Sequence, residues 1–279
     1  MGFLPTLFPL LRNIIMSSDK NGVLIPGVLK GFAADLVKLQ REYISVEAKP
    51  LDTELFDDQL GPKQSKFLGN PFFPVGTEYP KDKDGKHMVL LAQVNFSEVP
   101  ELPGFPSSGL LQLYFSVGNW WDMGTERIMY HTSEDLKKPS ISDFSFINTS
   151  EYDELPINKI HSLSFKKSID TGCSEDSQFS FMFGEHDYWD FEDTLSKNEK
   201  EEFSEYFSNE GHKIGGYADF TQSDPRDYDK KQRNDVQLLQ IDVDDFIMFG
   251  DSGVGHVFIN PDDLKSNKFE RAYFYWDCC

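Results

Sequence analysis

The residue types most suggestive of chemistry lie in the tetrapeptide Gly250-Asp251-Ser252-Gly253. The same four residues occur in the nucleophile loop of trypsin-like proteases, where a histidine oriented by a buried aspartate takes the serine proton. No Ala-Ala-His-Cys segment lies upstream to supply that histidine, and a match of four residues is weak by itself. We therefore interpret the tetrapeptide as a tight loop in which Asp251 hydrogen-bonds backbone amides.

A second candidate for acid–base chemistry is Glu185-His186-Asp187. Neighbouring residues of a strand point to opposite faces, so three consecutive side chains do not converge on one substrate atom. Further acidic residues follow at Asp190 and Glu192, which is typical of a solvated acidic loop. The six histidines show neither the HxH nor the HExxH spacing of metal sites. We predict no catalytic residue here.

Carboxylates also gather in the sequence at Asp242, Asp244 and Asp245, close to Asp251. Carboxylate oxygens are the ligands that Ca²⁺ prefers, so this group is a candidate cation site. The spacing of an EF-hand loop is absent. The sequence therefore predicts no bound metal and no cofactor.

The chain has three cysteines, Cys173 and the adjacent pair Cys278-Cys279. An odd and sparse set is no disulfide framework, and no CxxC pair or Cys/His cluster suggests zinc. No apolar stretch reaches the roughly 20 residues of a membrane-spanning helix. We expect a protein of the reducing cytoplasm that does not cross a membrane.

The negative charge is unevenly distributed. The chain has 279 residues and a net charge of −20, and residues 1–139 carry 14 basic and 17 acidic groups against 13 and 30 in residues 140–279. Nucleic-acid affinity rests on lysine and arginine displacing counterions, so the acidic half disfavours nucleic acid, and it disfavours anionic lipid for the same electrostatic reason. A basic protein partner fits this charge, and so does a role in solubility alone.

Two helices are expected to position these groups. Apolar residues recur at a period near 3.6 from Pro26 to about Val46, which predicts an amphipathic helix. A second helix should begin at Ser196, because Glu199 follows at the spacing of a capping box. Its buried stripe would contain Phe203, Tyr206 and Phe207, and Gly211 would stop it.

Strand signals dominate the rest of the chain. Short apolar runs bounded by turn residues, and one run that alternates in phenylalanine, each predict a strand. Long helices do not alternate with them, which disfavours a doubly wound parallel sheet. The expected fold is a β-rich α+β fold with mostly antiparallel sheets. The predicted strands are residues 89–92, 110–115, 179–183, 236–243, 257–259 and 272–276.

The chain also contains a repeated segment, preceded in each copy by a predicted helix. Residues 66–73 resemble residues 213–220, and Leu90 to Asn95 resemble Gln237 to Asp242, both at an offset of 147. Residues 109–113 are echoed by residues 255–259 at an offset of 146. We expect an internal duplication whose copies pack about a pseudo-twofold axis. The predicted parts are an extension with a helix (1–48), a first half (49–150) and a second, acidic half (151–279).

Gln93 and Gln240 occupy equivalent places in this duplication, within apolar strands. A buried amide without partners costs about 1–3 kcal/mol. The structural interpretation, which we favour, is that each amide clamps the nearby glycine loop through backbone hydrogen bonds. The functional interpretation is a ligand clamp at the pseudo-twofold axis. Its candidate residues are Gly69, Asn70, Pro71, Gln93, Gly216, Gln240 and Asp251.

Six short motifs occur in order along the chain. They are Lys-Phe-x-Gly-x-Pro-Phe (66–72), Leu-Leu-Ala-Gln-Val-Asn-Phe (90–96), Leu-Pro-Gly-Phe-Pro-x-x-Gly (102–109), Leu-Leu-Gln-Ile-Asp (238–242), Phe-Gly-Asp-Ser-Gly-Val-Gly (249–255) and Tyr-Trp-Asp-Cys-Cys (275–279). Together these motifs resemble the YwqG-like family, a bacterial domain of unknown function. The resemblance runs from about Leu51 to Cys279 and implies a cytoplasmic α+β fold with no established activity. That family usually shows Trp-Gly-Asp-Ala-Gly where this chain has Phe249 to Gly253, so the resemblance implies that a hydroxyl at Ser252 is no general requirement.

Three functions remain open from the sequence. The leading hypothesis is a non-enzymatic cytoplasmic interaction protein whose acidic half engages a basic protein partner, for example as an immunity-like protein against a toxin. The alternative is a hydrolase or small-ligand-binding enzyme with its site between the two copies. The third is an acidic scaffold without a ligand. The sequence leaves the oligomeric state open.

Overall fold

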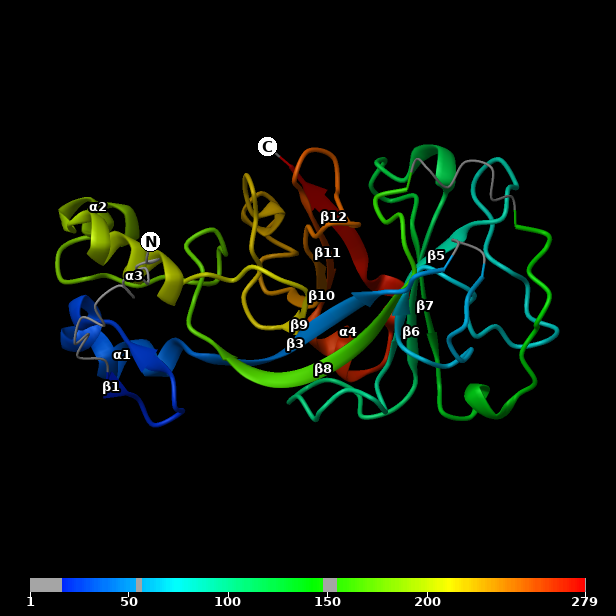
Figure 1. Ribbon diagram of the computed structural model, residues 1–279, viewed down its shortest axis with the longest axis horizontal. Coiled ribbons are helices and arrows are strands. Elements are labelled where there is room, and N and C mark those ends of the chain that lie inside the picture. The colour runs from blue at the N-terminus through cyan, green and yellow to red at the C-terminus, as the bar shows by residue number, and fades with distance from the viewer. Residues whose placement is uncertain (1–16, 54–56, 148–154, 279) are drawn as a thin grey trace, which may run out of the picture. The chain divides into compact units, whose positions relative to one another are not determined.

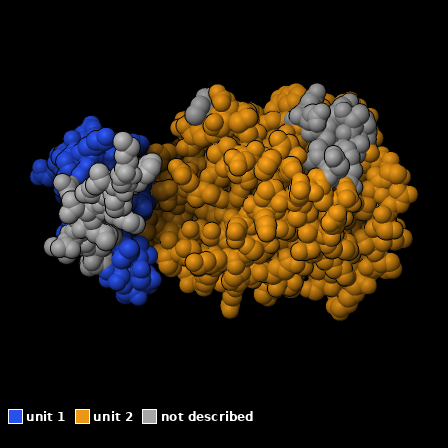
Figure 2. All heavy atoms as spheres, viewed as in Figure 1, with its two compact units in different colours: residues 1–39, 181–207 blue, residues 40–180, 208–279 orange. Residues whose placement is uncertain are grey.

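The computed structural model describes residues 17–53, 57–147 and 155–278, which form two compact units (Figure 2). The smaller, here called the helical unit, contains residues up to 39 together with 181–207. The larger, the sheet unit, contains residues 40–180 and 208 onward. Over these described ranges, no helix is long and apolar enough to cross a membrane.

The helical unit is held together by phenylalanines. Phe32 packs edge-on against Phe183 and Phe191, with ring centroids 5.4 and 5.6 Å apart, and Phe203 is fully buried. The capping box of Ser196 and Glu199 is present, as expected. The elements are β1 (Ser17–Ser18), β2 (Leu24–Ile25), a 3₁₀ helix (Gly27–Phe32), α1 (Ala33–Leu39), α2 (Tyr188–Thr194) and α3 (Lys197–Tyr206).

Three sequence predictions are wrong in extent or type. The first helix ends at Leu39, because the following residues include Tyr43, Ile44 and Val46, which favour a strand and form one. Helix α3 ends at Tyr206 rather than near Gly211. Residues 179–183 form no strand, since their phenylalanines pack into the aromatic clusters instead of a ladder.

The sheet unit contains one antiparallel sheet of ten strands, in the order β12-β11-β10-β9-β3-β8-β4-β5-β6-β7. Its centre is the long pair β3 and β8, whose ten residues pair along their full length (Figure 1). The β-rich antiparallel fold is therefore confirmed. The strands are β3 (Arg41–Pro50), β4 (Lys66–Phe67), β5 (Val89–Asn95), β6 (Leu110–Phe115), β7 (Arg127–His131), β8 (His161–Asp170), β9 (Lys213–Gly215), β10 (Val236–Ile241), β11 (Val254–Ile259) and β12 (Tyr273–Asp277).

The order of the strands reads alike from both edges, because β4 to β7 continue outward from β8 and β9 to β12 continue outward from β3. Lys66 pairs with Gln93 and Lys213 with Gln240, 147 residues later. The next ladder pairs Gln93 with Gln112 and Gln240 with His256, an offset of 144. The sequence alignment of residues 109–113 with 255–259 is thus two residues out of register.

Both arms of the sheet contribute to one apolar core. The rings of Phe115 and Phe274 lie 4.8 Å apart, and those of Tyr130 and Phe269 lie 4.3 Å apart. Each pair joins β6 or β7 to the C-terminal part of the chain, beyond β11. The sheet is therefore nearly closed around this core. Short helices before β12 are α4 (Pro261–Lys265) and a 3₁₀ helix (Phe269–Arg271).

Candidate functional site

A buried ion pair marks the start of the first half. The Nζ of Lys66 in β4 donates to Asp58 Oδ2 at 2.7 Å, and the two side chains are 0% and 1% exposed. The same carboxylate oxygen accepts the Asn70 N–H at 2.7 Å. Burial lowers the pKa of Lys66, and the bond to Asp58 opposes this shift. We call Asp58, Lys66, Gly69, Asn70 and Gln93 the first cradle.

Gln93 ties the loop of the first cradle together. Its Oε1 accepts the N–H of Phe72 at 2.9 Å. Its Nε2 donates to the carbonyls of Pro62 and Gln64 at 2.9 and 2.8 Å. These three partners are backbone groups, as the structural interpretation expects. The Nε2 of Gln112 also donates to Gln93 Oε1, at 2.8 Å. The amide of Gln93 therefore joins the loop to the neighbouring strand β6.

The second half repeats this construction. The Nζ of Lys213 in β9 donates to Asp170 Oδ2 at 3.1 Å and to Asn209 Oδ1 at 2.9 Å. Asp170 Oδ2 also accepts the N–H of Tyr217 at 2.8 Å, as Asp58 accepts that of Asn70. We call Asp170, Lys213, Gly216, Tyr217 and Gln240 the second cradle.

Gln240 makes the same three backbone contacts as Gln93. Its Oε1 accepts the N–H of Asp219 at 3.0 Å. Its Nε2 donates to the carbonyls of Asn209 and Gly211 at 3.0 and 2.9 Å. Each of these three backbone partners lies 147 residues after its counterpart around Gln93.

Glycine is required at the turn of each cradle. Gly69 and Gly216 have φ of +84° and +75°, in the left-handed region. A Cβ at either position would lie 2.5 Å from the carboxylate of Asp58 or Asp170. The preceding residues, Leu68 and Gly215, also have positive φ. The turn has the same backbone shape in both halves because it must bring an amide against a buried carboxylate.

A cavity of about 360 Å³ opens beside the turn of the second cradle. The wall contributed by the first half is apolar, and two charged residues come from the start of β3. Of the candidate ligand residues, Gly216 lines this cavity, whereas Gly69, Asn70, Pro71, Gln93, Gln240 and Asp251 are not among its lining residues. The lining is Arg41, Glu42, Leu102, Pro103, Phe105, Gln178, Gly215, Gly216 and Val236.

Arg41 is one of three polar side chains that line this cavity, with Glu42 and Gln178. Its guanidinium lies 3.8 Å above the centroid of the Tyr217 ring and donates to Gln178 Oε1 at 3.1 Å. Among the residues that the structure describes, no carboxylate forms an ion pair with it, whereas neighbouring Glu42 pairs with Lys167 at 3.0 Å. A guanidinium offers five N–H donors in a planar fork that matches a carboxylate or phosphate.

Asp251 is exposed and lies away from both cradles in sequence and in the sheet. It occupies a tight turn that the Gly253 N–H closes on the Phe249 carbonyl at 2.9 Å. This matches the expectation of a loop role for residues 250–253. In the helical unit, Asp187 caps α2 by accepting the Asp190 N–H at 2.8 Å, and Glu185 and His186 are exposed. Cys279 lies outside the described residues.

The aspartates near residue 245 do not gather around one point. Asp245 and Asp251 are exposed, whereas Asp244 faces two imidazoles, with Oδ2 3.6 Å from His212 Nε2 and 3.8 Å from His161 Nε2. His212 Nδ1 accepts the Asp242 N–H at 2.9 Å, so its Nε2 carries the proton in the neutral ring and offers no lone pair to a metal. Among the described residues, these four aspartates therefore do not converge on a common point.

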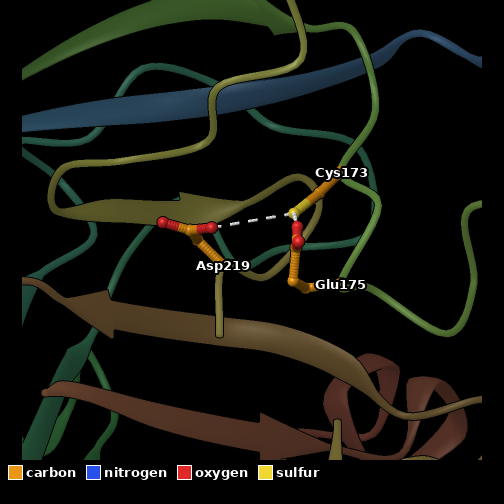
Figure 3. A group of neighbouring side chains, drawn as sticks. All are labelled: Cys173, Glu175 and Asp219. Carbon is orange, nitrogen blue, oxygen red and sulfur yellow. Dashed lines mark hydrogen bonds between the residues drawn. The ribbon is translucent and has the colours of Figure 1, made fainter. Parts of the chain in front are cut away.

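A different cluster, of Cys173, Glu175 and Asp219, lies next to the second cradle (Figure 3). The sulfur is 3.4 Å from Glu175 Oε2 and 3.7 Å from Asp219 Oδ1, and Cys173 is 1% exposed. Burial raises the pKa of Cys173 above its ordinary range. Burial, reinforced by the charge of Asp242, raises the pKa of Asp219 to about 7. No sequence motif predicts this cluster, because the loop after β8 meets the loop after β9 only in the fold.

The family profile of a domain of unknown function, DUF1963, matches residues 65–278. The match covers both cradles except for Asp58. A search of curated proteins finds no match.

Proposed function

The chain belongs to the DUF1963 family, a family without an assigned activity, and from this premise we propose that it is a non-enzymatic binding protein for a small carboxylate-bearing ligand. The observation that carries the proposal is Arg41, a guanidinium without an ion-pair partner among the described residues, which lines a cavity together with the apolar residues Leu102, Pro103 and Phe105. A ligand carboxylate would form an ion pair with the planar guanidinium of Arg41. An apolar chain would lie along Leu102, Pro103 and Phe105.

Matched probes test this proposal. Hexanoate carries both a carboxylate and an apolar chain, and hexan-1-ol carries the chain alone. By isothermal titration we expect hexanoate to bind with a Kd near or below about 1 mM, or about −4 kcal/mol, and hexanol to bind at least tenfold more weakly. Arg41→Met should remove that difference, because it keeps the apolar stem and deletes the charge. Equal binding of both probes to the unaltered protein would contradict the proposal.

A second candidate function is supported by charge. Residues 185–205 of the helical unit contain nine acidic and two basic side chains, and many of them are exposed on α2 and α3. Such a surface would attract a basic protein partner, as an immunity-like protein would, and the interaction would weaken with salt. The scarcity of cysteine supports a cytoplasmic setting.

Charge reversal on α3 tests this second function. Glu201→Lys combined with Glu205→Lys should reduce recovery of a basic partner from a pull-down at low salt, since both side chains are exposed. Lys197→Glu is the matched control and should not reduce it. A partner whose recovery ignores both salt and these substitutions would speak against the acidic surface.

We also propose that residues 49–150 and 151–279 are related by duplication and by a pseudo-twofold axis between β3 and β8. The support is the strand order, which reads alike from both edges, and the equivalent contacts of Gln93 and Gln240. On this view the ligand cavity formed where the loop of residues 102–105 of one copy meets the glycine turn of the other.

A further inference from the structure

The strongest candidate for an additional site is the cluster of Cys173, Glu175 and Asp219 in the sheet unit (Figure 3). One ligand atom from each side chain can be chosen so that all three lie within 4.8 Å of one another. Cys173 and Glu175 come from the loop after β8, and Asp219 follows the turn of the second cradle. We propose that these three side chains bind a divalent zinc ion.

The distances match what zinc imposes on its ligands. Zinc holds thiolate sulfur at about 2.3 Å and carboxylate oxygen at about 2.1 Å, in tetrahedral geometry. Those lengths and angles separate sulfur from oxygen by about 3.6 Å. The sulfur of Cys173 lies 3.4 Å from the oxygen of Glu175 and 3.7 Å from that of Asp219. Both sulfur–oxygen distances therefore fit a zinc coordination shell.

The charge of the cluster also favours a bound cation. Among the described residues, neither Glu175 nor Asp219 forms an ion pair, and the buried thiol can donate only one proton between them. Asp242 and Glu210 add further negative charge to the surroundings of Asp219. The cation that faces them, Lys213, is committed to Asp170 and to Asn209.

The position of Asp219 is held by the scaffold. Its N–H donates to Gln240 Oε1 at 3.0 Å, within the clamp of the second cradle. The equivalent residue of the first half is Phe72, whose N–H donates to Gln93 and whose side chain is fully buried. Thus the same clamped backbone position presents a carboxylate in one half and a ring in the other. Zinc is favoured over Ca²⁺ or Mg²⁺ because the third ligand is sulfur.

Binding is coupled to proton release. The metal ligand is the thiolate, so zinc binding breaks the S–H bond of Cys173 and passes that proton to the buffer. Asp219 loses its proton as well when it is protonated beforehand. Because protons compete with zinc, the affinity should rise between pH 6 and pH 8.

Cobalt substitution tests the site directly. The Cys278→Ser/Cys279→Ser protein leaves Cys173 as the sole thiol, so that a thiolate-to-cobalt absorption in the near ultraviolet reports this sulfur. We expect Co²⁺ to produce that absorption and Zn²⁺ to abolish it by displacement. Adding Cys173→Ser should eliminate the absorption and weaken zinc binding at least tenfold.

Substitution of the carboxylates keeps the test independent of the cysteine. Glu175→Gln alters a partly exposed side chain and should weaken zinc at least tenfold while circular dichroism stays unchanged. Asp251→Asn, which removes an exposed carboxylate outside the cluster, should leave the affinity within twofold. The proposal is overturned if Co²⁺ gives no thiolate absorption, or if Glu175→Gln binds zinc with the same affinity as the parent protein.

Discussion

The two cradles differ less in how they are built than in what surrounds them. In each, a buried lysine pairs with an aspartate that also accepts a turn amide, and a glutamine clamps three backbone groups. Around the first cradle the neighbouring side chain is Phe72, which is fully buried. Around the second lie the cavity with Arg41 and the cluster with Asp219. One scaffold therefore serves stability in both halves, and both proposed binding sites lie beside the second cradle.

Replacement of the buried lysines should have the largest effect on stability, and it tests whether the two cradles are equivalent. Lys66→Met and Lys213→Met each leave a buried carboxylate uncompensated, which costs about 3–5 kcal/mol of unfolding free energy. We expect similar losses from the two variants in urea denaturation. Lys38→Met, at the exposed pair with Asp35, should cost less than about 1 kcal/mol. A large loss at one cradle only would show that the two are not equivalent.

The glutamine clamps provide a milder comparison. Gln93→Leu and Gln240→Leu each leave a buried N–H and two carbonyls without their side-chain partner, at a cost of about 1–3 kcal/mol. Hydrogen exchange should speed up locally, at the Phe72 amide in the first variant and at the Asp219 amide in the second. If either variant is as stable as the parent protein, the clamp contributes nothing to the fold.

The two halves should differ in how their stability depends on pH, because His256 occupies the position that Gln112 has in the first half. Burial, together with Arg226, lowers the pKa of His256 from 6.5 to about 3. Between these values the unfolded chain binds the proton and the folded chain does not. The contribution of neutral, buried His256 to the free energy of unfolding is therefore fully present above pH 6.5. It decreases as the pH drops, by up to roughly 1.4 kcal/mol per pH unit.

His256→Gln introduces the residue that the first half has at the equivalent position, Gln112. It should remove the pH-dependent contribution of His256 to the free energy of unfolding. The measurement is the unfolding free energy of both proteins from pH 7 to pH 4. Their difference should change with pH below 6.5 and be constant above it. A difference that is constant throughout would mean that His256 is not buried in its neutral form.

Asp219→Phe gives the smallest expected effect on stability. It exchanges a carboxylate whose pKa burial raises to about 7 for the ring found at Phe72. We expect a change within about 1 kcal/mol in urea, together with loss of zinc binding. A fall of more than about 3 kcal/mol would show that the surroundings of the two positions differ more than their backbones do.

The repeated contacts could be predicted in part from the sequence. The offset of 147 placed Gln93 and Gln240 at equivalent positions, and their backbone bonds follow from the need to satisfy a buried amide. Their acidic partners escaped prediction because Asp58 lies eight residues before Lys66, whereas Asp170 lies 43 before Lys213. No constant offset relates these two carboxylates.

Other features depend on tertiary structure alone. The helical period continued past Leu39, but pairing with β8 turned the following residues into strand β3. Arg41 acquires its surroundings only through that strand, which brings it to Tyr217 and Gln178. Cys173 and Asp219 are 46 residues apart and meet through two loops that have no motif of their own.

The most direct test is anomalous diffraction at the zinc edge from crystals of the Cys278→Ser/Cys279→Ser protein grown with zinc. The account predicts one strong peak among Cys173, Glu175 and Asp219, no peak beside Phe72, and two cradles whose backbones superimpose. Cradles that do not superimpose, or zinc bound only at exposed carboxylates elsewhere, would contradict it.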